Sequence, residues 1–108
     1  MSKREAKLYI EDIVRSIQNI KEYVAEMSYD DFCEDQKTFD AVIRNFEVMG
    51  EAAYKMPVDM KQQYPQVPWS DLSDMRNKLI HEYFGVDREI VWQTIQEDLP
   101  KLFSIIND

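Results

Sequence analysis

The segment from Met75 to Tyr83 contains the residue types best suited to chemistry. His81 is the only histidine among 108 residues, and it lies five positions after Arg76 and two before Tyr83. A guanidinium group binds phosphate or carboxylate through its planar fork. An imidazole can accept and donate protons near neutral pH. An arginine, a histidine and a tyrosine this close together therefore suggest phosphoryl-transfer chemistry.

Helical spacing relates these side chains to one another. Arg76 and Tyr83 are seven residues apart and share one helix face. Asn77 and His81 are four apart, so the amide can reach the imidazole and fix its orientation. Arg76 and His81 are about 140° apart, and only the long arginine side chain would let both reach one phosphate. From spacing alone, a structural role for His81 remains the commoner outcome.

Composition limits the class of protein. The chain is 44% hydrophobic and 31% charged, which predicts one soluble globular domain over residues 1–108. Its formal net charge is −8, whereas a protein that holds long nucleic acid through its surface field is expected to be basic. Any contact with nucleic acid must therefore be local or depend on a partner.

Several other classes are excluded or disfavoured. Cys33 is the only cysteine, so no internal disulfide can form, and its acidic neighbours predict an unreactive thiol. One Cys and one His do not make a zinc site, and no glycine-rich phosphate loop is present, so we expect neither a metal nor another cofactor. No apolar stretch is long enough for a membrane span or a signal peptide, which predicts a cytoplasmic protein.

The first half of the chain predicts two long amphipathic helices, over about residues 3–27 and 34–55. Ser28, followed by Asp30 and Asp31, indicates a break at which a new helix could start. Apolar residues recur at alternating spacings of three and four, which favours an antiparallel helix pair. Gly50 lies inside the second helix, where glycine usually permits close approach of another backbone. Glu51 beside it is either a polar residue near that contact or a solvated glutamate. The apolar positions are Ile10, Ile13, Ile17, Ile20, Val24 and Met27, then Phe39, Val42, Phe46, Met49, Ala53 and Met56.

The second half begins with Pro57, which can open a short helix to about residue 63. Residues 64–69 are predicted to form a loop ending in Trp69, which we expect to pack against the bundle. Ser70 or Ser73 is predicted to cap a helix that runs to about residue 84, where Gly85 ends it.

The last helix is predicted to begin after Asp87 and to be kinked or interrupted at Pro100. Its apolar face comprises Val91, Ile95, Leu99, Leu102 and Ile106, widened by Trp92 and Phe103. The fold predicted is an all-α, up-and-down bundle of four long helices and a short fifth.

The central segment also resembles a known motif. Residues 76–83 match the Arg-x4-His-x-Tyr signature of HEPN-domain proteins, and the chain is similar to the small HepT-like toxins that are paired with MntA-like nucleotidyltransferase antitoxins. The similarity covers nearly the whole chain. Besides the signature, it includes Arg44 to Ala53, Val67 to Trp69, and Asp98 to Pro100.

This resemblance implies a HEPN-like fold and a metal-independent endoribonuclease that acts on RNA, with Arg76 and His81 as catalytic residues. Asn77 matches a polar position that often follows the arginine. Tyr83 matches the tyrosine that the antitoxin modifies with AMP (AMPylation) to silence the toxin. We assign Glu51 a supporting role because of its place beside Gly50.

Metal-free cleavage of RNA requires a base for the 2′-hydroxyl, an acid for the leaving 5′-oxygen and a cation for the phosphorane charge. One His81 per chain cannot easily hold both proton-transfer roles at once. A homodimer would bring two histidines together, with the Arg76 pair holding the phosphate in a cleft between the chains. AMP on Tyr83 would place a phosphate beside the arginines and compete with RNA.

Two other readings stay open. The chain could be a catalytically silent HEPN module that binds nucleotide, RNA or a nucleotidyltransferase partner. It could also be a helical dimerisation protein in which Arg76 and His81 are structural. The sequence does not identify the RNA that is cut or the surface to which an antitoxin binds.

Overall fold

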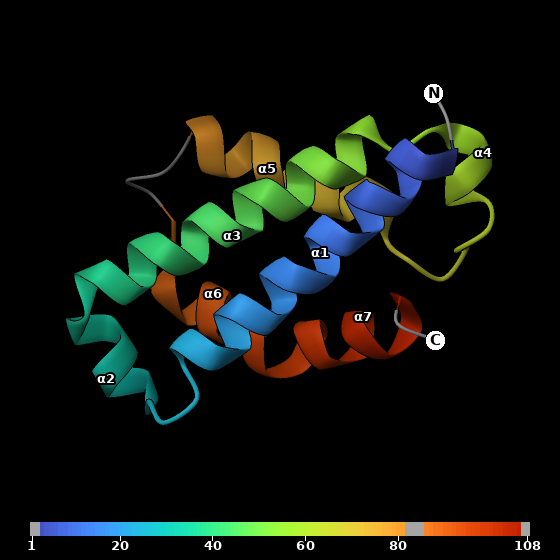
Figure 1. Ribbon diagram of the computed structural model, residues 1–108. Helices are drawn as coiled ribbons and strands as arrows, with labels where there is room; N and C mark the ends of the chain where they lie inside the picture. Colours follow the sequence, from blue (N-terminus) through green and yellow to red (C-terminus); the bar gives the residue numbers. More distant parts are fainter. Residues whose placement is uncertain (1–2, 82–85, 107–108) are drawn as a thin grey trace.

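The protein is an all-α, up-and-down bundle (Figure 1). The computed structural model describes residues 3–81 and 86–106, and among these the side chains of residues 5–77 and 86–106. Four long helical units alternate in direction through this part of the chain. They are α1 (Lys3–Tyr23), α3 (Gln36–Lys55), α5 (Trp69–His81), and a C-terminal unit made of α6 (Arg88–Gln93), the π-helical turn η2 (Thr94–Asp98) and α7 (Leu99–Ile106).

Helix α3 occupies the centre of the bundle, because it packs against both α1 and α5. The predicted three-four stripes form the core. In α1 and α3 they bury Ile13, Ile17 and Ile20 together with Phe39, Val42, Phe46, Met49 and Ala53. A buried polar contact also joins these helices: Asn19 donates to Asn45 across 3.1 Å, and Asn45 donates to the carbonyl of Ala41. The α1 stripe predicted the core, but this amide pair was not expected.

One short helix was predicted as such, and for a second the sequence indicated only its start, at Ser28. The predicted one is α4 (Val58–Lys61), which follows Pro57. The second is α2 (Tyr29–Glu34), which begins at that place with a capping box between Ser28 and Asp31. Asp35 ends α2 and also caps α3 by accepting from the Thr38 amide, so the two helices are separated by a single residue. The bundle therefore has one more short helix than we expected.

The start of α5 corrects another expectation. The helix begins at Trp69, so neither Ser70 nor Ser73 is its cap. The Leu72 amide donates to the carbonyl of Pro68, which allows the first turn to begin directly after the proline. Trp69 is buried, as expected, and its indole N–H donates to the carbonyl of Tyr64 at 3.1 Å. The predicted end of this helix near Gly85 lies outside the described residues.

The C-terminal unit begins at the predicted Asp87 cap, whose side chain accepts from the Glu89 amide. The predicted interruption at Pro100 takes the form of η2, directly before α7. Proline has no N–H and its ring clashes with the carbonyl four residues earlier, and a π-helical turn widens the backbone at that point. The Leu99 amide accordingly donates to the carbonyl of Thr94. No helix in the described part of the chain is long and apolar enough to cross a membrane.

Candidate active site around Arg76

The position of Arg76 depends on a close approach between α3 and α5. Gly50 is buried on α3, and a Cβ atom built there would overlap the Cβ of Arg76 and lie 2.8 Å from the carbonyl oxygen of Leu72. Any larger residue would force the two helices apart. The predicted close backbone approach at Gly50 is confirmed, and the structure identifies its partner as the turn of α5 that carries Arg76.

Two side chains fix the orientation of the Arg76 guanidinium. Its Nε donates to Oε2 of Glu51 at 2.8 Å, and its Nη1 donates to Oδ1 of Asn77 at 2.9 Å. The Arg76 side chain is 26% exposed, so it is partly shielded and still reachable from solvent. In addition, its Cζ lies 5.4 Å from the centroid of the Tyr54 ring. Because the two hydrogen bonds use Nε and Nη1, the Nη2 group is left without a partner among the described side chains.

Glu51 joins a second cation to this arrangement. Its Oε1 lies 3.1 Å from Nζ of Lys55, one helical turn further along α3. The hydrogen bond from Lys55, assisted by the charge of Arg76, holds the pKa of Glu51 below its ordinary value, although partial burial opposes this. Glu51 is therefore an ionised hydrogen-bond acceptor at neutral pH and not a proton donor. Two cations and one carboxylate leave the group with a net positive charge.

A cavity of about 450 Å³ adjoins these residues, within the size range of small-molecule sites. Helix α1 contributes Tyr9 and Asp12, and α5 contributes Arg76. The remaining lining residues come from α3 and are Arg44, Glu47, Val48, Glu51, Ala52 and Lys55. The cavity is thus built from the motif-bearing stretch of α3 and from the arginine of the signature.

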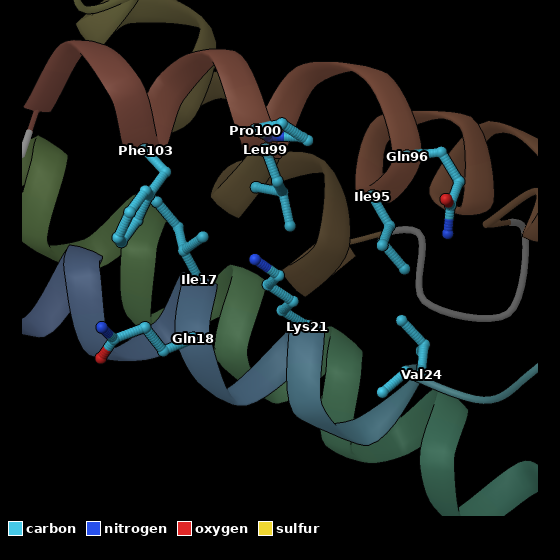
Figure 2. A pocket seen from close by; sticks show the side chains of 10 residues that line it. Ile17, Gln18, Lys21, Val24, Ile95, Gln96, Leu99, Pro100 and Phe103 are labelled. Atoms are coloured by element: carbon cyan, nitrogen blue, oxygen red, sulfur yellow. The ribbon is translucent and has the colours of Figure 1, made fainter.

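A larger cavity of about 630 Å³ lies elsewhere, between α1 and the C-terminal unit (Figure 2). Figure 2 shows Phe103 pointing towards Ile17, and Ile95 pointing towards Val24. The wall of this groove is mainly aliphatic and aromatic, with Lys21 as its charged member. Lys21 is the one titratable side chain among its lining residues and has no acid–base partner there, so the size of the groove alone does not make it an active site.

The structure brings together three of the predicted site residues, namely Arg76, Asn77 and Glu51. The backbone of α5 remains helical to His81, but the His81 side chain lies outside the described residues, as does all of Tyr83. The predicted contact from Asn77 to the His81 imidazole therefore stays a prediction. Within the described residues, no group of three or more His, Cys, Asp or Glu side chains could hold a metal ion.

Sequence reasoning missed Lys55 and Tyr54 as neighbours of the site. The sequence spacing could have indicated both: Tyr54 lies three and Lys55 four residues after Glu51, so both share its side of the helix. Their relation to the site depends on the packing of α5, which places Arg76 on that side of α3.

Comparison with known proteins shows which family this chain resembles. Residues 13–108 match the family model described as "Ribonuclease HepT-like". A probable ribonuclease HepT of Thermococcus cleftensis is 47% identical over 100 residues, which cover 93% of this chain and 91% of the relative. A putative RNase of Methanocaldococcus jannaschii is 38% identical over 112 residues, covering 100% of this chain and 93% of the relative. A putative RNase of Caldanaerobacter subterraneus is 38% identical over 94 residues, covering 87% and 84%. No solved structure gives a significant match.

Proposed function

The chain belongs to the ribonuclease HepT-like family, and we propose that this ribonuclease is a metal-independent endoribonuclease toxin of a toxin–antitoxin pair. In the proposal, Arg76 and His81 of two chains form a composite site at a homodimer interface. A nucleotidyltransferase antitoxin silences that site by attaching AMP to Tyr83. The observation that carries the proposal is the fixed Arg76 guanidinium beside the charged cavity, since a preoriented cation is what phosphoryl transfer requires.

The role of Arg76 is to bind the phosphate and stabilise the charge that develops on it. Its Nη2 group, without a partner among the described side chains, can form charge-assisted hydrogen bonds to a phosphate oxygen. Lys55 offsets the charge of Glu51, so that Glu51 holds Arg76 in place without neutralising the whole site. Asn77 holds the guanidinium from its other side.

Proton transfer is assigned to His81. Cleavage by the 2′-hydroxyl needs a base at that oxygen and an acid at the leaving 5′-oxygen. The ionised Glu51 does not supply the acid at neutral pH, and its oxygens already accept from Arg76 and Lys55. The two histidines of a homodimer provide one base and one acid, and two-fold dimers are the commonest protein assembly.

The proposal is tested by incubating the purified protein with RNA in EDTA. We expect the wild type to cleave RNA in EDTA, and we expect His81→Ala and Arg76→Ala each to lose at least about a hundredfold in rate. Arg44→Ala, which changes an exposed cation of the same cavity, is the matched control and should stay within about threefold of the wild type. Equal cleavage by wild type and His81→Ala would overturn the catalytic assignment. No cleavage by the wild type, with tight binding to a nucleotidyltransferase, would favour the silent binding module.

The silencing step has its own test. Tyr83→Phe removes the hydroxyl to which AMP would be attached and keeps the ring. We expect this variant to cleave RNA like the wild type and to remain active after incubation with a nucleotidyltransferase and ATP, whereas the wild type gains the mass of AMP and loses activity. An unmodified wild type, or a Tyr83→Phe variant that is still silenced, would contradict the assignment of Tyr83.

A further inference from the structure

Tyr54 is an exposed aromatic side chain beside the arginine of the proposed site. It lies on α3, its residue is 62% exposed, and the Arg76 guanidinium lies over its ring at 5.4 Å. A ring this exposed contributes little to the core and remains available to a ligand. Such a ring next to a phosphate-binding cation matches the arrangement by which proteins hold unpaired nucleotides.

The negative charge of the protein means that RNA binding needs a source of affinity besides phosphate contacts. The protein has a formal net charge of −8, which repels RNA at long range. The cavity beside Arg76 is lined by three cations (Arg44, Lys55 and Arg76) and three carboxylates (Asp12, Glu47 and Glu51). The positive charge of the group formed by Arg76, Lys55 and Glu51 is therefore offset across the cavity as a whole. Phosphate contacts alone would therefore hold RNA weakly. Stacking of a base on an aromatic ring does not depend on net charge, because every base has an apolar π-face.

We propose that Tyr54 is the stacking platform for one unpaired nucleobase, that of the nucleotide whose phosphate Arg76 binds. The inference rests on the proposed ribonuclease function and adds to it a base-binding subsite on α3. Cζ of Arg76 lies only 5.4 Å from the centroid of the Tyr54 ring, so a phosphate on one and a base on the other would belong to the same or the adjacent nucleotide. A base inside a duplex is stacked on its neighbours and cannot reach the ring.

The test uses 2′-O-methyl oligoribonucleotides, which lack the nucleophilic hydroxyl and stay intact whatever His81 does. A five-nucleotide strand is compared with five versions that each carry one abasic position. With wild-type protein, we expect removal of one particular base to weaken binding about tenfold. With Tyr54→Leu, the intact strand should bind about tenfold more weakly, and removal of the same base should then have no further effect. Such coupling between base and ring is what a double-mutant cycle detects.

Two variants separate stacking from other roles. Tyr54→Phe keeps the ring and should bind within about twofold of the wild type. Tyr23→Leu is the matched control, because Tyr23 is a 42% exposed tyrosine at the end of α1, and it should also stay within about twofold. The Tyr54 effect should keep its size between low and high salt, whereas binding lost in Arg76→Ala should depend on salt.

The outcomes that overturn the subsite differ from those that overturn the function. Equal losses from the abasic strand in wild type and Tyr54→Leu would show that no base stacks on this ring. A Tyr54→Leu protein that becomes monomeric in sedimentation experiments would make Tyr54 a dimer contact instead. Strands that bind neither protein also contradict the subsite. None of these results changes the His81-dependent cleavage of ordinary RNA, which tests the function by itself.

Discussion

Two contacts between helices in this bundle differ in how tightly they close. Where α3 meets α5, Gly50 lets the backbones approach until residue 50 has no room for a Cβ atom beside Arg76. Where α1 meets the C-terminal unit, a groove of about 630 Å³ remains (Figure 2). Both contacts bury apolar residues of the same core. The first contact also fixes the position of a cation, and the second does not.

Burial of apolar surface and positioning of a side chain are therefore separate demands on a helix pair. An apolar residue loses little if its partner moves by an ångström, because the hydrophobic effect is non-directional. A cation that must meet a phosphate can lose on the order of a hundredfold in rate from the same displacement. We therefore expect substitutions in the groove to reduce stability more than activity, and substitutions at the α3–α5 contact to reduce activity more than stability.

The largest loss of stability is expected from Leu99→Ala. Leu99 lines the groove and is 5% exposed, so truncation removes buried apolar surface and enlarges a space that is already open. We expect the free energy of unfolding to fall by about 2–4 kcal/mol in urea titrations. Activity per folded molecule should stay within about twofold. Ile90→Ala is the control, since Ile90 is 58% exposed and its truncation should cost less than about 0.5 kcal/mol. A large drop in the specific activity of folded Leu99→Ala would show that the two contacts are coupled.

A smaller loss of stability, with a larger loss of activity, is expected from Gly50→Ala. Alanine favours a helix by about 1 kcal/mol over glycine, but its Cβ would overlap Arg76. Overpacking costs about 1–3 kcal/mol, so after the gain in helix propensity we expect a net destabilisation of up to about 2 kcal/mol. Displacement of Arg76 should lower the rate at least about tenfold. Lys37→Ala, an exposed change on the same helix, controls for helix propensity. A more stable and fully active Gly50→Ala would show that the close approach is not needed.

The sequence predicted the core better than it predicted the boundaries of the helices. A three-four spacing of apolar residues specifies which face of a helix is buried. Residues such as Ile13 and Val42 can therefore be assigned to the core without knowing which helix packs against them. Ser28 was marked as a helix start, but α2 was not predicted as a separate helix. Its six residues are too few for a periodic pattern, and Asp35 both ends it and caps α3. Ser70 was predicted as a possible helix cap, but the helix begins earlier, because the Leu72 amide already donates to the carbonyl of Pro68.

The sequence predicted individual residues of the candidate site but not how they are arranged around one another. Gly50 indicated a close approach and Arg76 indicated a phosphate ligand, each from its own chemistry. Nothing in the spacing of either helix specified that Gly50 faces Arg76, because that depends on the register between α3 and α5. For the same reason, the ion pair from Arg76 to Glu51 was not predicted, although Glu51 had been singled out.

The smallest effect on stability is expected from Glu51→Gln, and this effect should depend on pH. The hydrogen bond from Lys55 and the charge of Arg76 lower the pKa of the folded Glu51 from its ordinary value of 4.5. A carboxylate with a lowered pKa stabilises the fold above its ordinary pKa, and this stabilisation is lost as the pH falls through the folded pKa. The Glu51 side chain is 40% exposed, so the ion pairs should contribute less than about 1 kcal/mol at pH 7.

We therefore expect the stability difference between wild type and Glu51→Gln to be constant near neutral pH and to disappear as the pH drops below 4.5. Glu47→Gln is a matched control on the same helix, whose partner Arg44 lies at the longer distance of 3.8 Å. Because glutamine can still accept from Nε of Arg76, the rate at pH 7 should fall only a few-fold, and Glu51→Ala should lose more. If Glu51→Gln instead cleaves RNA faster than the wild type, the carboxylate competes with the substrate phosphate for Arg76. The tight contact between α3 and α5 would then restrain the arginine and not prepare it for catalysis.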